Sequence, residues 1–259
     1  MCNCCSGPPV ACGSPARART YYGHCLRLLA DVEEVETNFR EAASVPKGRL
    51  RVDLSAALAR LLVIPALPEF LARFPQIELE LGTGDRFVDL LREGVDCALR
   101  VGDPGDTGMV GRRIAVLRQI TVASADYVRR HGRPRVLADL QDGHFAVHWA
   151  SPTTRRPEPL EFVVGRRRRE IHLPGRITVN GADAYLACCR AGLGIAQFSH
   201  YRIADELADG RMCELLPDTL PPALPMTVLY PPQRQMPARL RVFIDWLVER
   251  AAVQFGQVR

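Results

Sequence analysis

The sequence predicts an α/β protein built as two lobes. From Gly48 to Gly102 it reads as strand, helix, strand, helix and strand, with a turn-forming residue at each joint. Strands that are joined by helical crossovers lie parallel in one sheet. Later segments near Ala123 and near residues 221–226 carry the chain away from this unit and back to it. Two crossovers of this kind predict two lobes.

The composition is that of an ordinary globular protein. The chain has 259 residues, 47% apolar and 24% charged, which is enough for one or two domains with a full core. Its net charge is +5 and Lys47 is its only lysine, so its basicity alone indicates non-specific attraction to anions and no more. We recognise neither an apolar run long enough to span a bilayer nor a secretory signal, and we expect a cytoplasmic protein whose nine cysteines are mostly thiols.

Two different segments precede the first strand. Residues 1–19 lack apolar periodicity and are rich in Cys, Gly, Pro and Ser, which predicts a disordered tail or a start-site artefact. Their cysteines lack the paired C-x-x-C spacing of zinc sites, so no metal is expected. In residues 20–46, apolar residues alternate spacings of four and three, which predicts a coiled-coil-type helix that pairs with another helix or packs on its own domain.

The first lobe is expected to comprise residues 48–123 and 226–255. Apolar and polar residues alternate from Leu50 to Leu54 and from Ile77 to Leu81, as in half-buried strands. The leucines between Leu58 and Leu71 lie on one helical face, and Phe74-Pro75 stops that helix. A final helix over 237–255 has a similar apolar face and should close against this lobe.

The second lobe is expected over residues 124–220. Ser124 should cap one helix, and Asn180 should cap another over 182–190. The segment 160–171 predicts a hairpin whose tip is Gly165–Arg169. Four consecutive arginines there could bind phosphate, but no aromatic residues interleave with them, so we favour a solvated tip.

The chain from Tyr21 to about Arg250 resembles the LysR-type transcriptional regulators. The motifs that carry the resemblance are YYGHCLRLLADVEEVE, GRLRV, LPEFLARFP, DRFVDLLREGVDCALRVG, VNGADAYLACCRAGLGIA and DELADGRMCELLPD, and their order and spacing together are specific. The resemblance implies a type-two periplasmic-binding-protein-like fold with a central cleft, preceded by a long linker helix that dimerises. It also implies an effector-binding domain over 48–255, without the winged helix-turn-helix that such regulators carry in front.

The candidate site follows from the parallel strands. Ligands of open parallel sheets bind beyond the carboxyl ends of the strands, where helix N-termini offer free N–H groups. Hydroxyls and a fixed positive charge at those ends suit a small anionic molecule. The resemblance favours five effector-binding residues, namely Ser55, Thr83, Arg100, Gln197 and Phe198, and the cleft is expected to include Gly84, Asp85, Ser124, Trp149 and Asn180 as well.

These residues also have structural explanations. Ser55, Asp85, Ser124 and Asn180 could simply cap helices, Arg100 could pair with a carboxylate such as Asp103, and Phe198 could belong to the core. One departure from the family pattern is Ser199, which stands where many relatives have proline.

The sequence therefore predicts a sensor rather than an enzyme. We find no nucleophile with a base, no paired catalytic carboxylates and no metal set in the motifs, and no cofactor is expected. The expected partners are a small-molecule effector, such as a carboxylate, and further copies of the chain in a dimer or tetramer. Promoter DNA is expected to bind only through a module that this chain lacks. The alternatives are a free-standing small-molecule-binding module and, more distantly, an enzyme.

Overall fold

The computed structural model describes residues 45–256 apart from 85–89, 106, 152–153 and 233–234. The chain from Pro46 onward forms one compact unit. Apart from its last two residues, the expected linker helix lies outside the described residues, as do the N-terminal tail and Asp85. The described residues hold a five-stranded and a three-stranded sheet with separate cores, in agreement with the expected two-lobed α/β architecture.

The first lobe contains a five-stranded sheet in the order β2-β1-β3-β12-β4. Its strands are β1 (Gly48–Leu54), β2 (Ile77–Thr83), β3 (Cys97–Val101), β4 (Val110–Leu117) and β12 (Leu224–Tyr230). β1 pairs parallel with both β2 and β3, which confirms the predicted crossovers, whereas β12 runs antiparallel to β3 and β4. The returning strand is thus inserted into the middle of the sheet.

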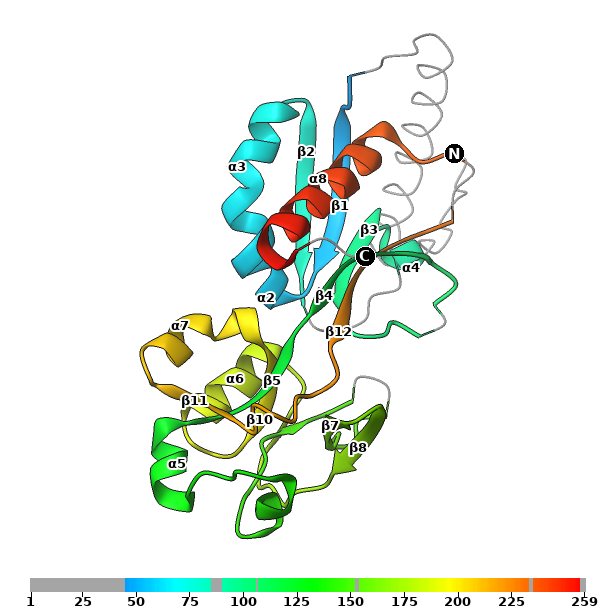
Figure 1. Ribbon diagram of the computed structural model, residues 1–259. Helices are drawn as coiled ribbons and strands as arrows, with labels where there is room; N and C mark the ends of the chain where they lie inside the picture. The colour runs from blue at the N-terminus through cyan, green and yellow to red at the C-terminus, as the bar shows by residue number, and fades with distance from the viewer. Residues whose placement is uncertain (1–44, 85–89, 106, 152–153, 233–234, 257–259) are drawn as a thin grey trace, which may run out of the picture. The chain divides into compact units, whose positions relative to one another are not determined.

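Helices cover this sheet on the face that carries its largest core. The first crossover is one continuous helical stretch made of α2 (Ala56–Leu58), the π-helical segment η1 (Ala59–Val63) and α3 (Ile64–Arg73); α8 (Ala238–Phe255) is the last helix, and the short α4 is Leu90–Glu93. α3 and α8 lie over the same face in Figure 1. Phe70 from α3 packs against Phe243 and Trp246 from α8, with ring centroids 5.4 and 5.0 Å away, so α8 closes the first lobe as expected.

The second lobe is built on a three-stranded antiparallel sheet in the order β10-β5-β11. Its strands are β5 (Gln119–Ser124), β10 (Ala196–Ser199) and β11 (Met212–Leu215), and the short pair β6 (His148–Trp149) and β9 (Thr178–Val179) and the hairpin β7 (Leu160–Val164) and β8 (Arg167–Ile171) lie beside it. Its helices are α5 (Ala125–His131), α6 (Ala182–Arg190) and α7 (Ala204–Ala208), with the 3₁₀ turns η2 (Leu137–Gln141) and η3 (His200–Arg202). Ile120 and Ala123 belong to different core clusters because successive strand residues face opposite sides.

The chain passes between the two sheets at two places. On one side β4 ends at Leu117 and β5 begins at Gln119, so Arg118 alone makes the crossing. On the other side residues 216–223 connect β11 to β12. The first crossing lies five residues before the expected one near Ala123, because the apolar run of β5 belongs to the second sheet and not to the first.

Two local expectations were wrong. The tip of the hairpin is only Gly165 and Arg166, because Val164 already pairs with Arg167, so most of the arginine run is on β8. The N-cap of α6 is Gly181, and its start has no side-chain cap hydrogen bond, so Asn180 does not cap this helix. Ser124 does cap α5, because its Oγ accepts a hydrogen bond from the backbone N–H of Tyr127 at 3.2 Å.

A buried polar cluster in the second lobe uses one of the histidines. Tyr127 Oη lies 3.2 Å from Nδ1 of His144 and accepts the N–H of Phe145 at 2.8 Å. His131 stacks on the Tyr127 ring with centroids 4.5 Å apart. Burial lowers the pKa of His144, and the nearby His131 lowers it further. His148, on β6, instead contacts the Leu173 carbonyl at 3.0 Å, so it does not share a site with His144.

Candidate functional site

The carboxyl ends of β1 and β2 bring the first predicted residues together. Leu54 and Thr83 are register partners, and the N–H of Gly84 donates to the Leu54 carbonyl at 2.9 Å. Ser55 follows Leu54 directly and is the N-cap of α2, but its side chain makes no capping hydrogen bond. In the part of the chain that the structure describes, neither the Ser55 hydroxyl nor that of the exposed Thr83 has a hydrogen-bond partner.

The start of α2 adds backbone donors to these hydroxyls. The first N–H groups of a helix have no intrahelical acceptor, and the first bond in this stretch is from the N–H of Ala59 to the carbonyl of Ser55, at 3.0 Å. The continuous helix from Ala56 to Arg73 also directs its positive end toward Ser55. Ser55, Thr83 and the free N–H groups at the start of α2 therefore lie at the same end of the sheet.

Arg100 lies next to this corner, but its charge is already compensated. Its Nη2 donates to the Asp53 carboxylate and its Nη1 donates to the Leu99 carbonyl at 3.2 Å. The two charged side chains are 6% and 12% exposed, so this is a buried ion pair. The expected partner, Asp103, instead accepts the N–H of Gly105 at 3.0 Å.

The glycine at position 82 makes room for this pair. A Cβ at Gly82 would lie 2.7 Å from the Asp53 Oδ2 atom, which is closer than real contacts of this kind. Gly82 is the register partner of Asp53 on the neighbouring strand. The Asp53 carboxylate can therefore fold over the sheet toward β2 while it still reaches Arg100 from β3.

The start of α6, in the second lobe, packs against α2. Asp183, in the first turn of α6, forms an ion pair with Arg60 of η1 at 3.7 Å and another with Arg202 at 3.1 Å. Asn180 is exposed and Gly181 half-buried just before this turn. The structure thus brings the start of α6, which Asn180 precedes, next to the helix that follows Ser55.

The aromatic residues form a wall behind the start of α6. Trp149 packs edge-on against Tyr185 at 5.6 Å between ring centroids, and Tyr185 packs against Phe198 at 4.8 Å. Phe198 is only 2% exposed and belongs to a core cluster, with the guanidinium of Arg202 5.5 Å from its ring centroid. Burial raises the pKa of Tyr185, whose hydroxyl accepts the N–H of Gln197 at 3.2 Å.

Gln197 is committed to a structural link between two strands. Its Oε1 accepts the N–H of Glu161 at 3.1 Å, and its Nε2 donates to the carbonyl of the same residue at 2.8 Å. Nε2 also donates to the Thr121 hydroxyl at 3.1 Å. The side-chain amide thus behaves like a neighbouring peptide group and holds β7 against β10.

Ser124 is not part of the same corner. It lies beside Gly192, just beyond the last residue of α6, whereas Asn180 precedes the first. Nine helical residues separate these two ends, or about 13 Å at about 1.5 Å per residue. A cavity of about 400 Å³ opens at the Ser124 end, lined by residues 124–126, 129, 190, 206 and 209–212.

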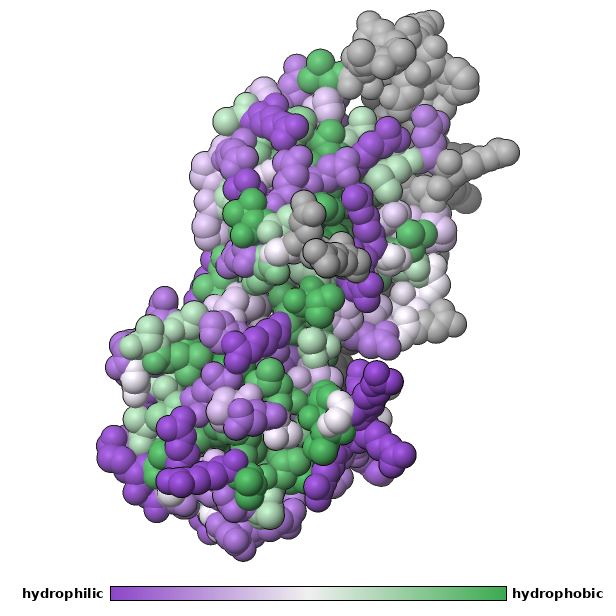
Figure 2. Space-filling model, viewed as in Figure 1, coloured by the Kyte–Doolittle hydropathy of each residue, from purple (hydrophilic) through white to green (hydrophobic). Residues whose placement is uncertain are grey.

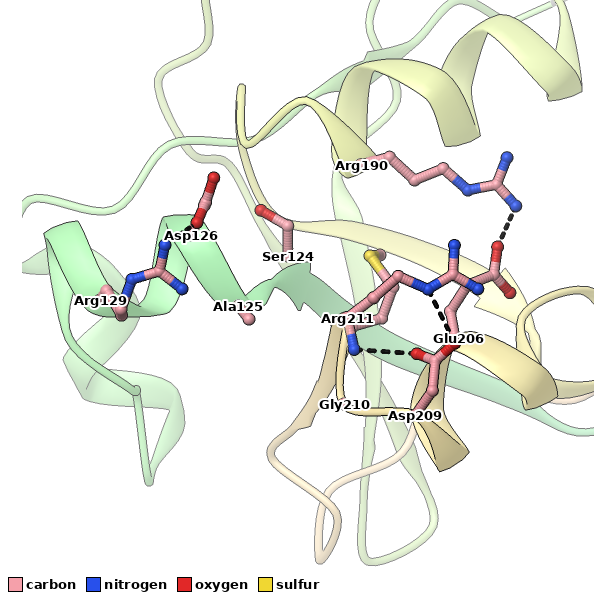
Figure 3. Close-up of a pocket in the computed structure, with 10 residues that line it drawn as sticks. Ser124, Ala125, Asp126, Arg129, Arg190, Glu206, Asp209, Gly210 and Arg211 are labelled. Carbon is pink, nitrogen blue, oxygen red and sulfur yellow. Dashed lines mark hydrogen bonds and ion pairs between the residues drawn. The ribbon is translucent and has the colours of Figure 1, made fainter.

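Charged side chains in this cavity pair with one another, as Figure 3 shows. Arg190 bonds to the mostly buried Glu206, and the Nε of Arg211 lies 2.7 Å from Oδ2 of Asp209. The hydrogen bonds from Arg211 lower the pKa of Asp209. Apart from Ser124, none of these residues was a sequence candidate, because their approach depends on how α5, α6 and β11 pack.

The described residues contain no cluster of three or more His, Cys, Asp or Glu side chains that could hold a metal ion. No helix in the described part of the chain is long and apolar enough to cross a membrane.

A profile of the LysR substrate binding domain matches residues 43–252. The chain belongs to the LysR family of transcriptional regulators. It is 33% identical over 228 residues to the HTH-type transcriptional regulator YhjC of Escherichia coli, which covers 88% of this chain and 76% of that protein. It is 31% identical over 229 residues to an HTH-type transcriptional repressor of Pseudomonas aeruginosa, which covers 88% of this chain and 72% of the repressor.

The fold agrees with this LysR assignment. The regulatory domain of CrgA, a LysR-type regulator from Neisseria meningitidis, superposes with a TM-score of 0.69 at 27% identity and covers 80% of this chain and all of that domain. The two-lobed, periplasmic-binding-protein-like α/β fold is therefore that of a LysR effector-binding domain, and the relatives named above are transcriptional regulators.

Proposed function

We propose that this LysR-type chain senses a small anionic metabolite at the corner between the start of α2 and the start of α6. Ser55 and Thr83 contact the effector directly, together with the backbone at Gly84 and the free N–H groups of α2. Asn180 approaches it from the second lobe. The other predicted residues, Arg100, Gln197 and Phe198, support the corner from behind.

The observation that carries this proposal is the pair of uncommitted hydroxyls beside a helix N-terminus. Carboxylates and phosphates bind well at helix N-termini, because the N–H groups point outward and the helix dipole favours negative charge. Since Asp53 compensates Arg100, anion selectivity at this corner comes from the hydroxyls and N–H groups. A ligand that touches both α2 and α6 favours one arrangement of the lobes over another, which is how binding would be signalled.

Thermal denaturation with a panel of aromatic and aliphatic carboxylates tests the effector class, with the corresponding amides as uncharged controls. A ligand at about 100 times its dissociation constant adds about 2.7 kcal/mol to the free energy of unfolding. We expect at least one acid, and not its amide, to raise the melting temperature. If amides stabilise the protein as well as their acids do, the effector is not recognised as an anion.

Two variants locate the site. S55A and T83A should each weaken the response to an acid that stabilises the wild type, because each removes one hydrogen-bond donor. The matched control is T178A, which alters an exposed threonine on β9 of the second lobe. Equal responses in T83A, S55A and T178A would place the site elsewhere.

We also propose that the chain acts as a homodimer or homotetramer, as the family resemblance implies. Light scattering coupled to size exclusion, over a hundredfold range of concentration, measures its mass. A monomer at every concentration would contradict this part of the proposal.

A further inference from the structure

The β7–β8 hairpin presents a run of four exposed arginines on a short projecting ribbon. Its base is anchored, because Leu160, Phe162 and Ile171 are buried in one core cluster. Beyond this base, Val163 and Val164 are 37% and 47% exposed, and Arg166–Arg169 are exposed. In Figures 1 and 2 the hairpin lies at the lower right, where the surface is strongly hydrophilic.

Three hydrogen bonds fix the hairpin through its first strand, β7. The Gln197 amide binds both backbone groups of Glu161, and the N–H of Val163 donates to the Leu220 carbonyl at 2.9 Å. These contacts all reach β7, and β8 is the outer strand of a two-stranded sheet. The strand that carries the arginines therefore faces outward from a fixed support.

The positive charges on β8 are poorly compensated within the protein. Among the described residues, Arg168 reaches the Glu161 carboxylate at 3.9 Å, and Arg166, Arg167 and Arg169 have no carboxylate within ion-pair distance. The acidic residue of β8 itself, Glu170, lies 3.9 Å from His172. Some arginines elsewhere in the chain are paired more closely, as Arg51 is with Glu80 at 2.7 Å.

The arrangement of these charges determines what kind of anion fits them. Successive strand residues point to opposite faces, so Arg167 and Arg169 share one face, Arg168 occupies the other, and Arg166 is at the turn. Because the four side chains do not converge on one point, the arrangement suits a polymer with regularly spaced charges better than one small anion. No aromatic residue lies among the arginines for a base to stack on.

We propose that β8 is a contact surface for the phosphate backbone of duplex DNA, used without sequence selectivity. In this arrangement the arginines neutralise phosphates and release bound counterions, so they add affinity and salt dependence but no base reading. None of the arginines of this surface belongs to the effector corner at the starts of α2 and α6. The surface would hold the regulatory domain against DNA that the regulator has already engaged.

The test measures binding of the full 259-residue chain to a fluorescent 30-base-pair duplex of random sequence by anisotropy, as a function of salt concentration. The hairpin variant is R166Q/R167Q/R168Q/R169Q. The slope of log K against log salt is negative, and each lost phosphate contact should make it shallower by about 0.9. For three lost contacts, a rise from about 50 to about 200 mM salt should weaken wild-type binding by about 40-fold more than it weakens variant binding.

Two further variants separate this contact from general basicity and from misfolding. R135Q/R155Q/R176Q/R241Q removes the same charge from four dispersed, exposed arginines and should keep the wild-type slope. The lysine version of the hairpin, R166K/R167K/R168K/R169K, retains the positive charge and should also keep the wild-type slope. The proposal is overturned if the wild type does not bind DNA at low salt, or if wild type and hairpin variant have the same slope of log K against log salt. It is also overturned if the dispersed variant reduces that slope as much as the hairpin variant does.

Discussion

Removal of Asp53 should destabilise the first lobe more than removal of any exposed acidic residue. The Asp53 and Arg100 side chains are 12% and 6% exposed, so D53A leaves a guanidinium buried without its carboxylate. Loss of one partner from a buried pair costs about 3–5 kcal/mol. We expect about 3 kcal/mol, at the lower end, because Arg100 keeps its bond to the Leu99 carbonyl and a further interaction.

The chain offers a matched control for this change. Arg112 and Asp245 form an ion pair at 3.0 Å in the same lobe, but their side chains are 47% and 54% exposed. D245A should therefore cost less than about 1 kcal/mol, because water screens that pair. Urea denaturation followed by tryptophan fluorescence measures both, since the buried Trp246 reports on the core of this lobe.

A double-mutant cycle separates the pair from other effects of the substitution. R100M should also be destabilising, since it leaves the Asp53 carboxylate buried alone, whereas D53A/R100M leaves no buried charge. We expect the double variant to be less destabilised than the sum of the single variants by about 2–3 kcal/mol. Additive effects, or a D53A cost no larger than that of D245A, would refute the assignment of a buried pair.

Two further changes test the packing and the buried histidine. G194A should cost about 1–3 kcal/mol in urea, because its Cβ would lie 2.6 Å from the backbone nitrogen of Val147. G181A, whose Cβ would approach no described atom closer than 4.0 Å, should cost less, up to about 1 kcal/mol, because alanine is a poorer N-cap than glycine for α6. Burial lowers the pKa of His144 in the folded state, so the unfolded chain binds this proton more readily. The contribution of neutral His144 to stability is therefore complete above about pH 6.5 and is lost as the pH falls below that value. Melting temperatures from pH 8 to pH 5 should therefore fall more steeply in wild type than in H144Q, and parallel curves would contradict this.

Local patterns predicted the elements well, but they could not predict the partners. Alternation from Leu50 to Leu54 and the apolar faces of α3 and α8 depend on neighbours in sequence, and these elements formed as expected. Asp53, by contrast, is 47 residues from Arg100, and its role follows from the position of β1 beside β3. The nearby Asp103 was the natural expectation because sequence shows only nearness along the chain.

The candidate site shows the same division. The sequence predicts the parallel pairing of β1 and β2, and this pairing puts Thr83 opposite Leu54, the residue before Ser55. The bonds of Gln197 to Glu161 depend on where the hairpin packs, and sequence has no signal for that. Ser124 could be recognised as a cap from sequence. Its distance from Asn180 could not, because it depends on the two residues lying at opposite ends of α6.

The crossing at Arg118 has a mechanical consequence. Leu117 still pairs with Leu224 in one sheet, and Thr121 already pairs with Leu215 in the other, so hardly any backbone between them is unconstrained. The carbonyl of Arg118 also accepts a hydrogen bond from the N–H of His200 at 2.9 Å. Because so few backbone torsions lie between the two sheets here, a small change in φ or ψ of Arg118 would rotate β5, and the sheet it belongs to, relative to β4.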